Sequence, residues 1–296
     1  MFKKQSKLDK VILVFNYVVL AIIVLVVLIP LIYVLIASVT NPTTLVNSGI
    51  SFNPLKWTFQ GYNRVFKDGS LLLGFRNSLF YSSAFSVISV VVTLFAGYPL
   101  SRDGFVGKKF IMTIFLITMF FSGGLIPTYL LVKNLNMLDS VWSILLPGSI
   151  NVMNIILART YFQSIPNALR EAAIIDGSSE MQYFFKILLP LCKPIIAVLV
   201  LYQFVAQWNS YFDAMIYLKS AALQPLQIIL RSILVQMQPN PGMMGAGSAQ
   251  DAAQRQQLAE LLKYACIVVS SLPLLLMYPF FQKYFEKGVM MGSIKG

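Results

Sequence analysis

Polar and aromatic side chains gather in one stretch of the chain that is otherwise strongly apolar. They supply amide, indole, phenol and carboxylate groups, at Gln203, Trp208, Asn209, Tyr211 and Asp213. Polar groups are costly inside a membrane and usually face the interior of a helix bundle or water. Aromatic faces beside amides and carboxylates also suit a sugar, which offers apolar C–H faces and many hydroxyls. The stretch therefore predicts the lining of a pathway through the membrane. The alternative is that its Trp and Tyr mark a membrane interface, with Asp213 near the outer end of the span.

Two asparagines in an earlier apolar stretch, Asn151 and Asn154, have two interpretations. They could line the same pathway. They could equally form hydrogen bonds between membrane helices, each worth about 0.6–2 kcal/mol.

Residues for catalysis or metal binding are scarce. The 296 residues include no histidine, and the acids are scattered along loops, so no His-dependent triad or clustered carboxylate site is visible. The two cysteines, Cys192 and Cys266, have no metal-ligand spacing and are predicted to be free, packed thiols. No G-x-x-x-x-G-K-[ST] phosphate loop is present. We therefore predict a protein that is not an enzyme, holds no metal and binds no cofactor.

Composition indicates the elements that position these side chains. Hydrophobic residues make up 57% of the chain and charged residues 11%, against about a quarter charged in a soluble protein. This predicts an all-α protein that crosses the membrane several times. The formal net charge of +12 is attributed to loops that fix orientation, not to nucleic-acid binding.

A bilayer core needs about 20 apolar residues per helix, and six stretches qualify. They lie at about 11–36, 78–100, 110–132, 140–161, 193–218 and 263–282. The third is interrupted at 122–124 and the fourth at Pro147-Gly148, and such breaks need neighbouring protein or a wet cavity. The second is rich in serine, which allows close helix approach, so it is predicted to be interior.

The side of each loop follows from its basic residues. Six spans place both termini on one side, and the segments on that side are richer in Lys and Arg, so both termini are predicted to be cytoplasmic. Two long outer segments run from about 37 to 77 and from about 219 to 262. The second contains Met237, Met243 and Met244, which could form an adaptable contact surface or a disordered loop.

A polar segment at 163–190, between the fourth and fifth spans, would lie on the cytoplasmic side. Pro166 suits the start of a helix over Asn167–Asp176, Gly177 suits its left-handed end, and Ser179 with Gln182 fits a capping box that opens a second helix. Pro190 is predicted to end that helix. Both helices carry more apolar residues than a solvated connector needs, so they are predicted to be covered by a partner or by lipid headgroups.

The spacing of this segment resembles a known motif. Glu171-Ala172-Ala173, a glycine six residues after the Glu, and Ile187-Leu188-Leu189-Pro190 are similar to the EAA loop of inner-membrane permease subunits of binding-protein-dependent ABC importers. WNSYFDAMIYL at 208–218, PLQIILRSIL at 225–234 and the tail from residue 278 resemble the carbohydrate branch of that family, of the MalG-like LplC/YtcP type.

The resemblance implies one permease chain of an ATP-driven sugar importer in the bacterial cell membrane. Its partners would be a second permease subunit, a cytoplasmic ATPase dimer that binds ATP and Mg, and an extracellular substrate-binding lipoprotein. The helix–Gly–helix would sit in a cleft of the ATPase, and the residues assigned to coupling are Glu171, Ala172, Ala173, Asp176, Gly177, Phe184, Phe185, Leu189 and Pro190.

Two other classes compete with this interpretation. A stand-alone secondary transporter or channel would often show internal repeats or charged midplane sites, and the sequence shows no repeat and few charges within its spans. A membrane enzyme would need a site that the residues above do not supply. Neither class accounts for a cytoplasmic helix–Gly–helix of this spacing.

Overall fold

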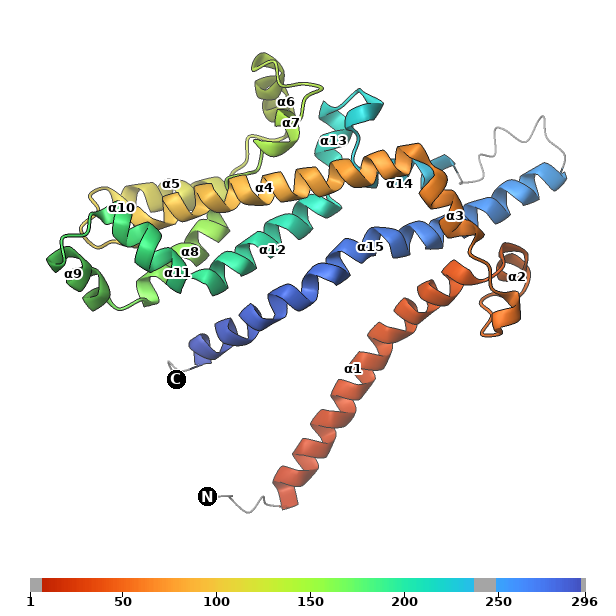
Figure 1. The fold of residues 1–296 in the computed structure, drawn as a ribbon, viewed down its shortest axis with the longest axis horizontal. Coiled ribbons are helices and arrows are strands. Elements are labelled where there is room, and N and C mark those ends of the chain that lie inside the picture. Colours follow the sequence, from red (N-terminus) through yellow and green to blue (C-terminus); the bar gives the residue numbers. More distant parts are fainter. Residues whose placement is uncertain (1–6, 237–248, 294–296) are drawn as a thin grey trace. The chain divides into compact units, whose positions relative to one another are not determined.

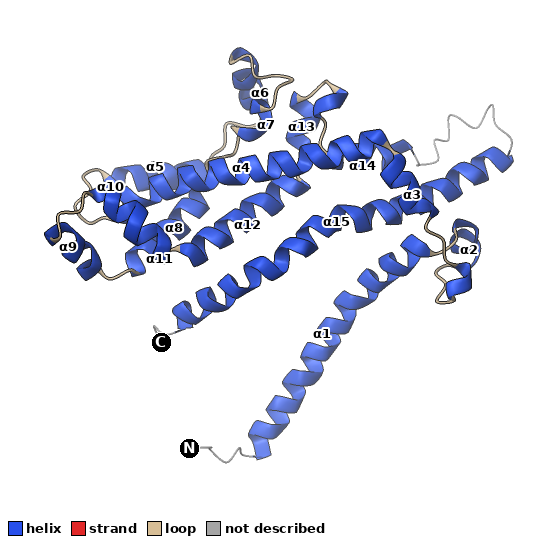
Figure 2. Ribbon diagram, in the orientation of Figure 1, coloured by secondary structure: helices blue, strands red, loops and turns tan. Residues whose placement is uncertain are grey.

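The computed structural model describes residues 7–236 and 249–293. Within this described part every regular element is helical, and the one isolated β-bridge joins Thr40 to Trp57 (Figure 2). The chain divides into two compact units, which we describe separately. The first takes in the described parts of 1–69 and 232–271, and the second those of 70–231 and 272–296.

The first unit begins with a long apolar helix. Helix α1 (Lys7–Val39) includes a stretch of mean hydropathy 3.4, none of which is buried inside the chain. A helix that is apolar on all sides suits lipid or another subunit. The outer segment after it folds into α2 (Pro42–Ser48), η1 (Pro54–Lys56) and α3 (Gln60–Lys67). The hydroxyls of Ser38 and Tyr62 hydrogen-bond at 2.7 Å, which ties this segment to the end of α1.

Helix α4 (Gly69–Ser101) forms the centre of the second unit (Figure 1). Its serines at 78, 82, 86 and 89 are buried, as the prediction of an interior span requires. Small residues bring the helices close together, since a Cβ placed at Gly97 would lie 3.2 Å from the Ala158 Cβ on α8 (Val152–Ser164). Helix α12 (Lys193–Asn209) also packs against α4, where the Gln203 amide donates to the Ser89 hydroxyl.

The predicted interruptions of the third and fourth spans are present. Helix α5 (Lys108–Phe120) ends before the glycine pair, and α6 (Leu125–Asn134) leaves it at an angle of 112°. Gly124 sits at φ +84°, a conformation that glycine adopts without strain. In the fourth span, α7 (Trp142–Leu145) is only one turn long and is separated from α8 by the Pro147-Gly148 turn.

Two sequence expectations about element ends are wrong. The fifth span does not continue to 218 as one helix, because α12 ends at Asn209 and α13 (Phe212–Tyr217) follows after a break. The last predicted span does not begin at 263 either, because α15 (Ala249–Ser293) starts within the outer segment 219–262. That segment also holds η3 (Ala221–Leu223) and α14 (Leu226–Gln236). Met237, Met243 and Met244 lie outside the described residues.

Three helical stretches of the described chain are long and apolar enough to cross a membrane. They are Leu8–Val39, Gly69–Ser101 and Leu262–Tyr284, and two bent helix pairs would raise the count to five. These pairs are α5 with α6, and the Glu180–Leu191 segment with α12. The protein is therefore an all-α membrane protein, while the count of six spans stays a prediction.

Candidate functional site

The segment 163–190 forms the predicted helix, glycine turn and second helix. Helix α9 (Asn167–Ile175) ends in two hydrogen bonds that define a Schellman cap, Ser178 N to Ala173 O at 2.9 Å and Gly177 N to Ile174 O at 3.0 Å. Gly177 takes φ +80°, and a Cβ placed there would meet no heavy atom within 4 Å. Glycine is therefore favoured at this position by the backbone conformation and not by crowding.

The second helix begins at the predicted capping box. The Ser179 hydroxyl accepts from Gln182 N, and the Gln182 side chain accepts from Ser179 N. Helix α10 (Glu180–Tyr183) then continues through a π-helical turn, η2 (Phe184–Leu188), into α11 (Leu189–Leu191). The prediction that Pro190 ends this helix is therefore wrong by one residue. The chain bends by 78° at Cys192, the residue that precedes α12.

The apolar side chains of this segment separate into two sets. One set is buried in the protein's own core against α4, α8 and α12, and consists of Ala173, Tyr183, Phe184 and Leu188. The Phe184 ring packs against Tyr98 of α4, with ring centroids 4.8 Å apart. The resemblance assigns Ala173 and Phe184 to contact with the ATPase, but both are covered by this chain's own core and cannot form that contact in this conformation.

The other set faces outward. Ile175 is 84% exposed and Met181 54%, and Phe185 is half-exposed. Of the remaining residues assigned to coupling, Glu171, Ala172, Asp176 and Pro190 are exposed and Leu189 is half-buried. The segment is thus anchored by one face and presents an apolar surface on the other.

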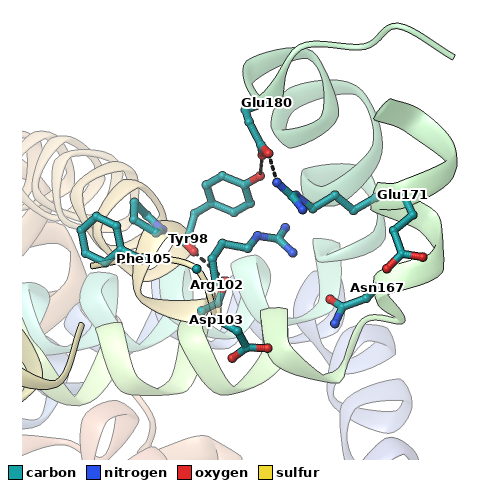
Figure 3. A pocket seen from close by; sticks show the side chains of 11 residues that line it. Tyr98, Arg102, Asp103, Phe105, Asn167, Glu171 and Glu180 are labelled. Atoms are coloured by element: carbon teal, nitrogen blue, oxygen red, sulfur yellow. Dashed lines mark hydrogen bonds and ion pairs between the residues drawn. The ribbon is translucent and has the colours of Figure 1, made fainter. Parts of the chain in front are cut away.

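A polar cluster joins the two helices of this segment to the end of α4 (Figure 3). The Glu180 carboxylate accepts from the Tyr98 hydroxyl at 2.5 Å and forms an ion pair with Arg170. The hydrogen bond to the Glu180 carboxylate raises the pKa of the Arg170 guanidinium above its usual value. The Arg102 guanidinium lies 4.5 Å from the centre of the Tyr98 ring and 5.3 Å from that of Tyr183. These contacts hold α10 against α4.

A cavity of about 500 Å³ opens beside this cluster. Its wall combines the end of α4 and the turn after it with Asn167, Arg170, Glu171 and Glu180. Figure 3 shows Arg102 between Tyr98 on one side and Asn167 and Glu171 on the other. Buried Nε and Nη2 of Arg102 have no hydrogen-bond acceptor within the described residues, and stacking on two tyrosine rings compensates part of that cost. Sequence reasoning missed this cluster, because Tyr98 and Glu180 lie far apart along the chain.

The residues predicted to line a pathway do not share one environment. Three of them are buried inside the chain: Gln203, Trp208 and Asn154. Trp208 is 1% exposed and stacks with Phe204 at a centroid distance of 6.0 Å. Since a buried side chain cannot touch a solute in this conformation, these three residues act as packing and hydrogen-bonding groups here.

The other pathway candidates reach the surface. Asn209 and Tyr211 are exposed and flank the break between α12 and α13, and Asp213 is half-buried one residue into α13. Asn151 is exposed, but its side chain caps α8 by accepting from Asn154 N at 3.0 Å. The break after α12 therefore gathers Asn209, Tyr211 and Asp213, the accessible pathway candidates of the predicted fifth span.

Neither a metal site nor a disulfide is formed by the described residues. No group of three His, Cys, Asp or Glu side chains among them is placed to hold a metal ion. Cys192 and Cys266 are free and buried, as predicted.

Comparisons with known proteins give consistent results. The family profile described as binding-protein-dependent transport system inner membrane component matches residues 89–291. The chain is 37% identical to the polygalacturonan/rhamnogalacturonan transport system permease protein YtcP of Bacillus subtilis (strain 168), over 92% of this chain and 94% of that protein. It is 35% identical to Protein LplC of the same organism, over 91% and 90%.

A solved structure shares the fold. It is that of a bacterial ABC transporter involved in the import of the acidic polysaccharide alginate, and one of its chains matches with a TM-score of 0.84 at 31% identity. The match covers 96% of this chain and 100% of that chain.

Proposed function

This chain belongs to the family of binding-protein-dependent transport system inner membrane components, and from that premise we propose how it works within a sugar importer. As a permease component it is a membrane protein and not itself an enzyme. We propose that it forms half of the pathway for an oligosaccharide, together with a second permease subunit. An ATPase dimer that binds ATP and Mg would drive it, and an extracellular binding lipoprotein would deliver the sugar.

One observation carries the coupling role. The segment 163–190 is fixed to the core by Tyr183, Phe184 and Leu188, while Ile175 and Met181 project from its other face. An exposed apolar surface on a rigid element is typical of a docking site. A displacement of that surface by a bound ATPase would be transmitted to α4 and α12 through close-packed side chains, because packed interiors have low compressibility. We therefore propose that Ile175, Met181 and Phe185 contact the ATPase, with Glu171 and Asp176 at the edge of the contact. Because the ATPase is cytoplasmic, this segment and both termini would lie on the cytoplasmic side.

Because Gln203, Trp208 and Asn154 are buried, we assign the lining of the pathway to the exposed residues at the break after α12. Irregular backbone within a span is tolerated where it is buried in protein or lines a water-filled cavity. Asn209 and Tyr211 are exposed on this chain. They would therefore face the cavity between the two permease subunits, with Asp213 and Asn151 as secondary candidates.

The first experiment identifies the partners. The tagged chain is extracted in mild detergent, and the proteins that co-purify are identified by mass spectrometry. We expect an ATPase with a phosphate loop and a second multi-span permease. A chain that purifies alone across several detergents and crosslinkers would contradict the proposal and favour a stand-alone transporter.

A matched pair of variants tests coupling at Gly177. Asn and Asp both tolerate the left-handed conformation, and the position has room for either side chain. Gly177→Asn and Gly177→Asp differ mainly in charge, so both should insert and fold. We expect ATP-driven uptake to be lost with Gly177→Asp and largely kept with Gly177→Asn. Normal uptake by Gly177→Asp would refute the assignment of this turn to the docking surface.

A further inference from the structure

An arginine outside the predicted pathway residues lies against the break after α12. Arg231 of α14 is exposed, and its guanidinium carbon lies 5.1 Å from the centre of the Tyr211 ring. Its Nη1 donates to the sulfur of Met215 on α13. The contact therefore brings α14 to the point where the fifth span is broken.

The guanidinium of Arg231 has no acidic partner in the described part of the chain, where the ion pairs are Lys108–Asp103 and Arg170–Glu180. Asp213 lies only two residues from Tyr211 but forms no ion pair with Arg231. A thioether sulfur is a weak acceptor, which a carboxylate would readily replace. An arginine presents five N–H donors in a planar fork that matches a carboxylate in bidentate geometry.

The surroundings of Arg231 are held in place. Leu226 N, at the start of α14, donates to the Ser78 hydroxyl of α4 at 2.8 Å. The preceding turn is fixed by Asn77, whose Nδ2 donates to Ala222 O at 2.8 Å, and by the Tyr81 hydroxyl, which donates to Leu223 O at 2.9 Å. A site on rigid elements holds its groups in position before the ligand arrives.

The break supplies the two other groups that a sugar needs. Tyr211 is 41% exposed, so part of its ring is open to an apolar C–H face. Asn209 donates to Val205 O at 2.9 Å through Nδ2, which leaves its Oδ1 to accept from a hydroxyl. The break lies within the predicted fifth span, where irregular backbone is tolerated only against protein or water, so these groups are expected to face protein or water and not acyl chains.

We infer that Arg231, Tyr211 and Asn209 form a recognition site for a saccharide that carries a carboxylate, that is, a uronic-acid oligosaccharide. The guanidinium binds the carboxylate, the ring packs against the sugar face and the amide accepts from a hydroxyl. This inference rests on the proposed function and assigns the substrate class of its pathway.

The test uses two probes with the same sugar backbone, one with free carboxylates and one with neutral methyl esters. They are trigalacturonate and its fully methyl-esterified form, offered to proteoliposomes that contain the whole complex and its binding protein. Uptake is compared for wild type, Arg231→Gln, Arg231→Lys and the control Arg76→Gln, another exposed arginine of the same unit. The binding protein is the same throughout, so the change in the acid-to-ester ratio between variants reports the permease alone.

We expect Arg231→Gln to lower uptake of the free acid at least tenfold while uptake of the ester changes less than twofold. Arg231→Lys keeps the charge but loses the planar fork of donors, so its uptake of the free acid should lie between that of wild type and that of Arg231→Gln. Arg76→Gln should resemble wild type. An equal loss for both probes would show a packing role for Arg231, and a loss only in vesicles rich in anionic lipid would show a headgroup contact. Either result, or no loss at all, overturns the inference.

Failure of the inference can be told apart from failure of the proposed function. A wild-type complex that imports uncharged oligosaccharides with ATP but never a uronic-acid one would overturn the substrate class alone. A chain that binds no ATPase and supports no ATP-driven uptake of any saccharide would overturn both.

Discussion

The turn at Gly177 gives the sharpest quantitative prediction. Its φ of +80° lies in the left-handed region, and no heavy atom lies within 4 Å of a Cβ placed there. A substitution should therefore cost backbone strain alone. That strain is roughly 1–2 kcal/mol for an ordinary L-residue, less for Asn, and more for a β-branched residue. Since about 1.4 kcal/mol is a factor of ten in population, Gly177→Ala should open the turn about tenfold more often.

The Schellman hydrogen bonds provide a direct readout. Gly177 N and Ser178 N donate to the last turn of α9, so their hydrogen exchange reports opening of the cap. Exchange measured by mass spectrometry should be fastest for Gly177→Val, about tenfold faster than wild type for Gly177→Ala, and only slightly faster for Gly177→Asn. The chain should remain folded in all three variants, because the strain is small against a typical stability of about 5–15 kcal/mol.

Gly104→Ala is the matched control. It also lies in a turn with no heavy atom within 4 Å of an added Cβ, but its φ is not positive. It should leave hydrogen exchange in the segment 163–190 unchanged. Equal acceleration by Gly177→Ala and Gly177→Asn would refute the argument from strain. If Gly177→Ala and Gly177→Asn both kept slow hydrogen exchange at the cap but lost ATP-driven uptake, the result would point instead to a partner that approaches this turn closely.

Three further predictions follow from side chains in the core and at the outer turns. Ser82 is fully buried and its hydroxyl has no partner among the described residues, so Ser82→Ala should raise or preserve the midpoint of thermal unfolding. Ser89→Ala should lower that midpoint, because it leaves the buried amide of Gln203 without its hydrogen-bond acceptor. Phe184→Ala should destabilise the protein by about 3–5 kcal/mol in denaturant unfolding, and Phe185→Ala by clearly less, because only Phe184 is buried. Hydrogen bonds from Ser220 lower the pKa of Asp139 in the folded protein. The ionised carboxylate therefore stabilises the outer turn fully above the pKa that Asp139 has in the unfolded chain, and this stabilisation is lost as pH falls through the lower pKa of the folded protein. Hydrogen exchange across that turn should become faster only at acid pH in wild type, and should be faster at all pH values in Asp139→Asn.

Local signals allowed the helix–glycine–helix at 163–190 to be predicted from sequence. The proline at its start, the glycine at the turn and the Ser179–Gln182 capping box each act over three or four residues. Capping and left-handed turns are set by such short-range hydrogen bonds and backbone preferences. The apolar helices and the helix breaks at the glycine and proline pairs were predicted for the same reason.

The end of the fifth helix was not predictable in this way. Nothing in the sequence between Trp208 and Leu218 forbids a continuous helix, yet α12 ends at Asn209. The Asp139 carboxylate accepts from Lys219 N and Ser220 N, and α13 packs against α7 in the core around Tyr81. These contacts join parts of the chain about 80 residues apart, which no local pattern reports.

The sequence by itself therefore determined an all-helical membrane protein with a capped helix–glycine–helix, because hydropathy and capping depend on neighbouring residues. The tertiary structure alone decided which apolar and polar side chains are buried. Phe184 and Phe185 are adjacent and chemically identical, but only the first meets Tyr98 and the core. Trp208 is enclosed by Phe75 and Phe204, while Tyr211, three residues on, stays exposed beneath Arg231. The physical reason is that burial depends on which distant surface packs against a helix face, and that surface exists only once the chain has folded.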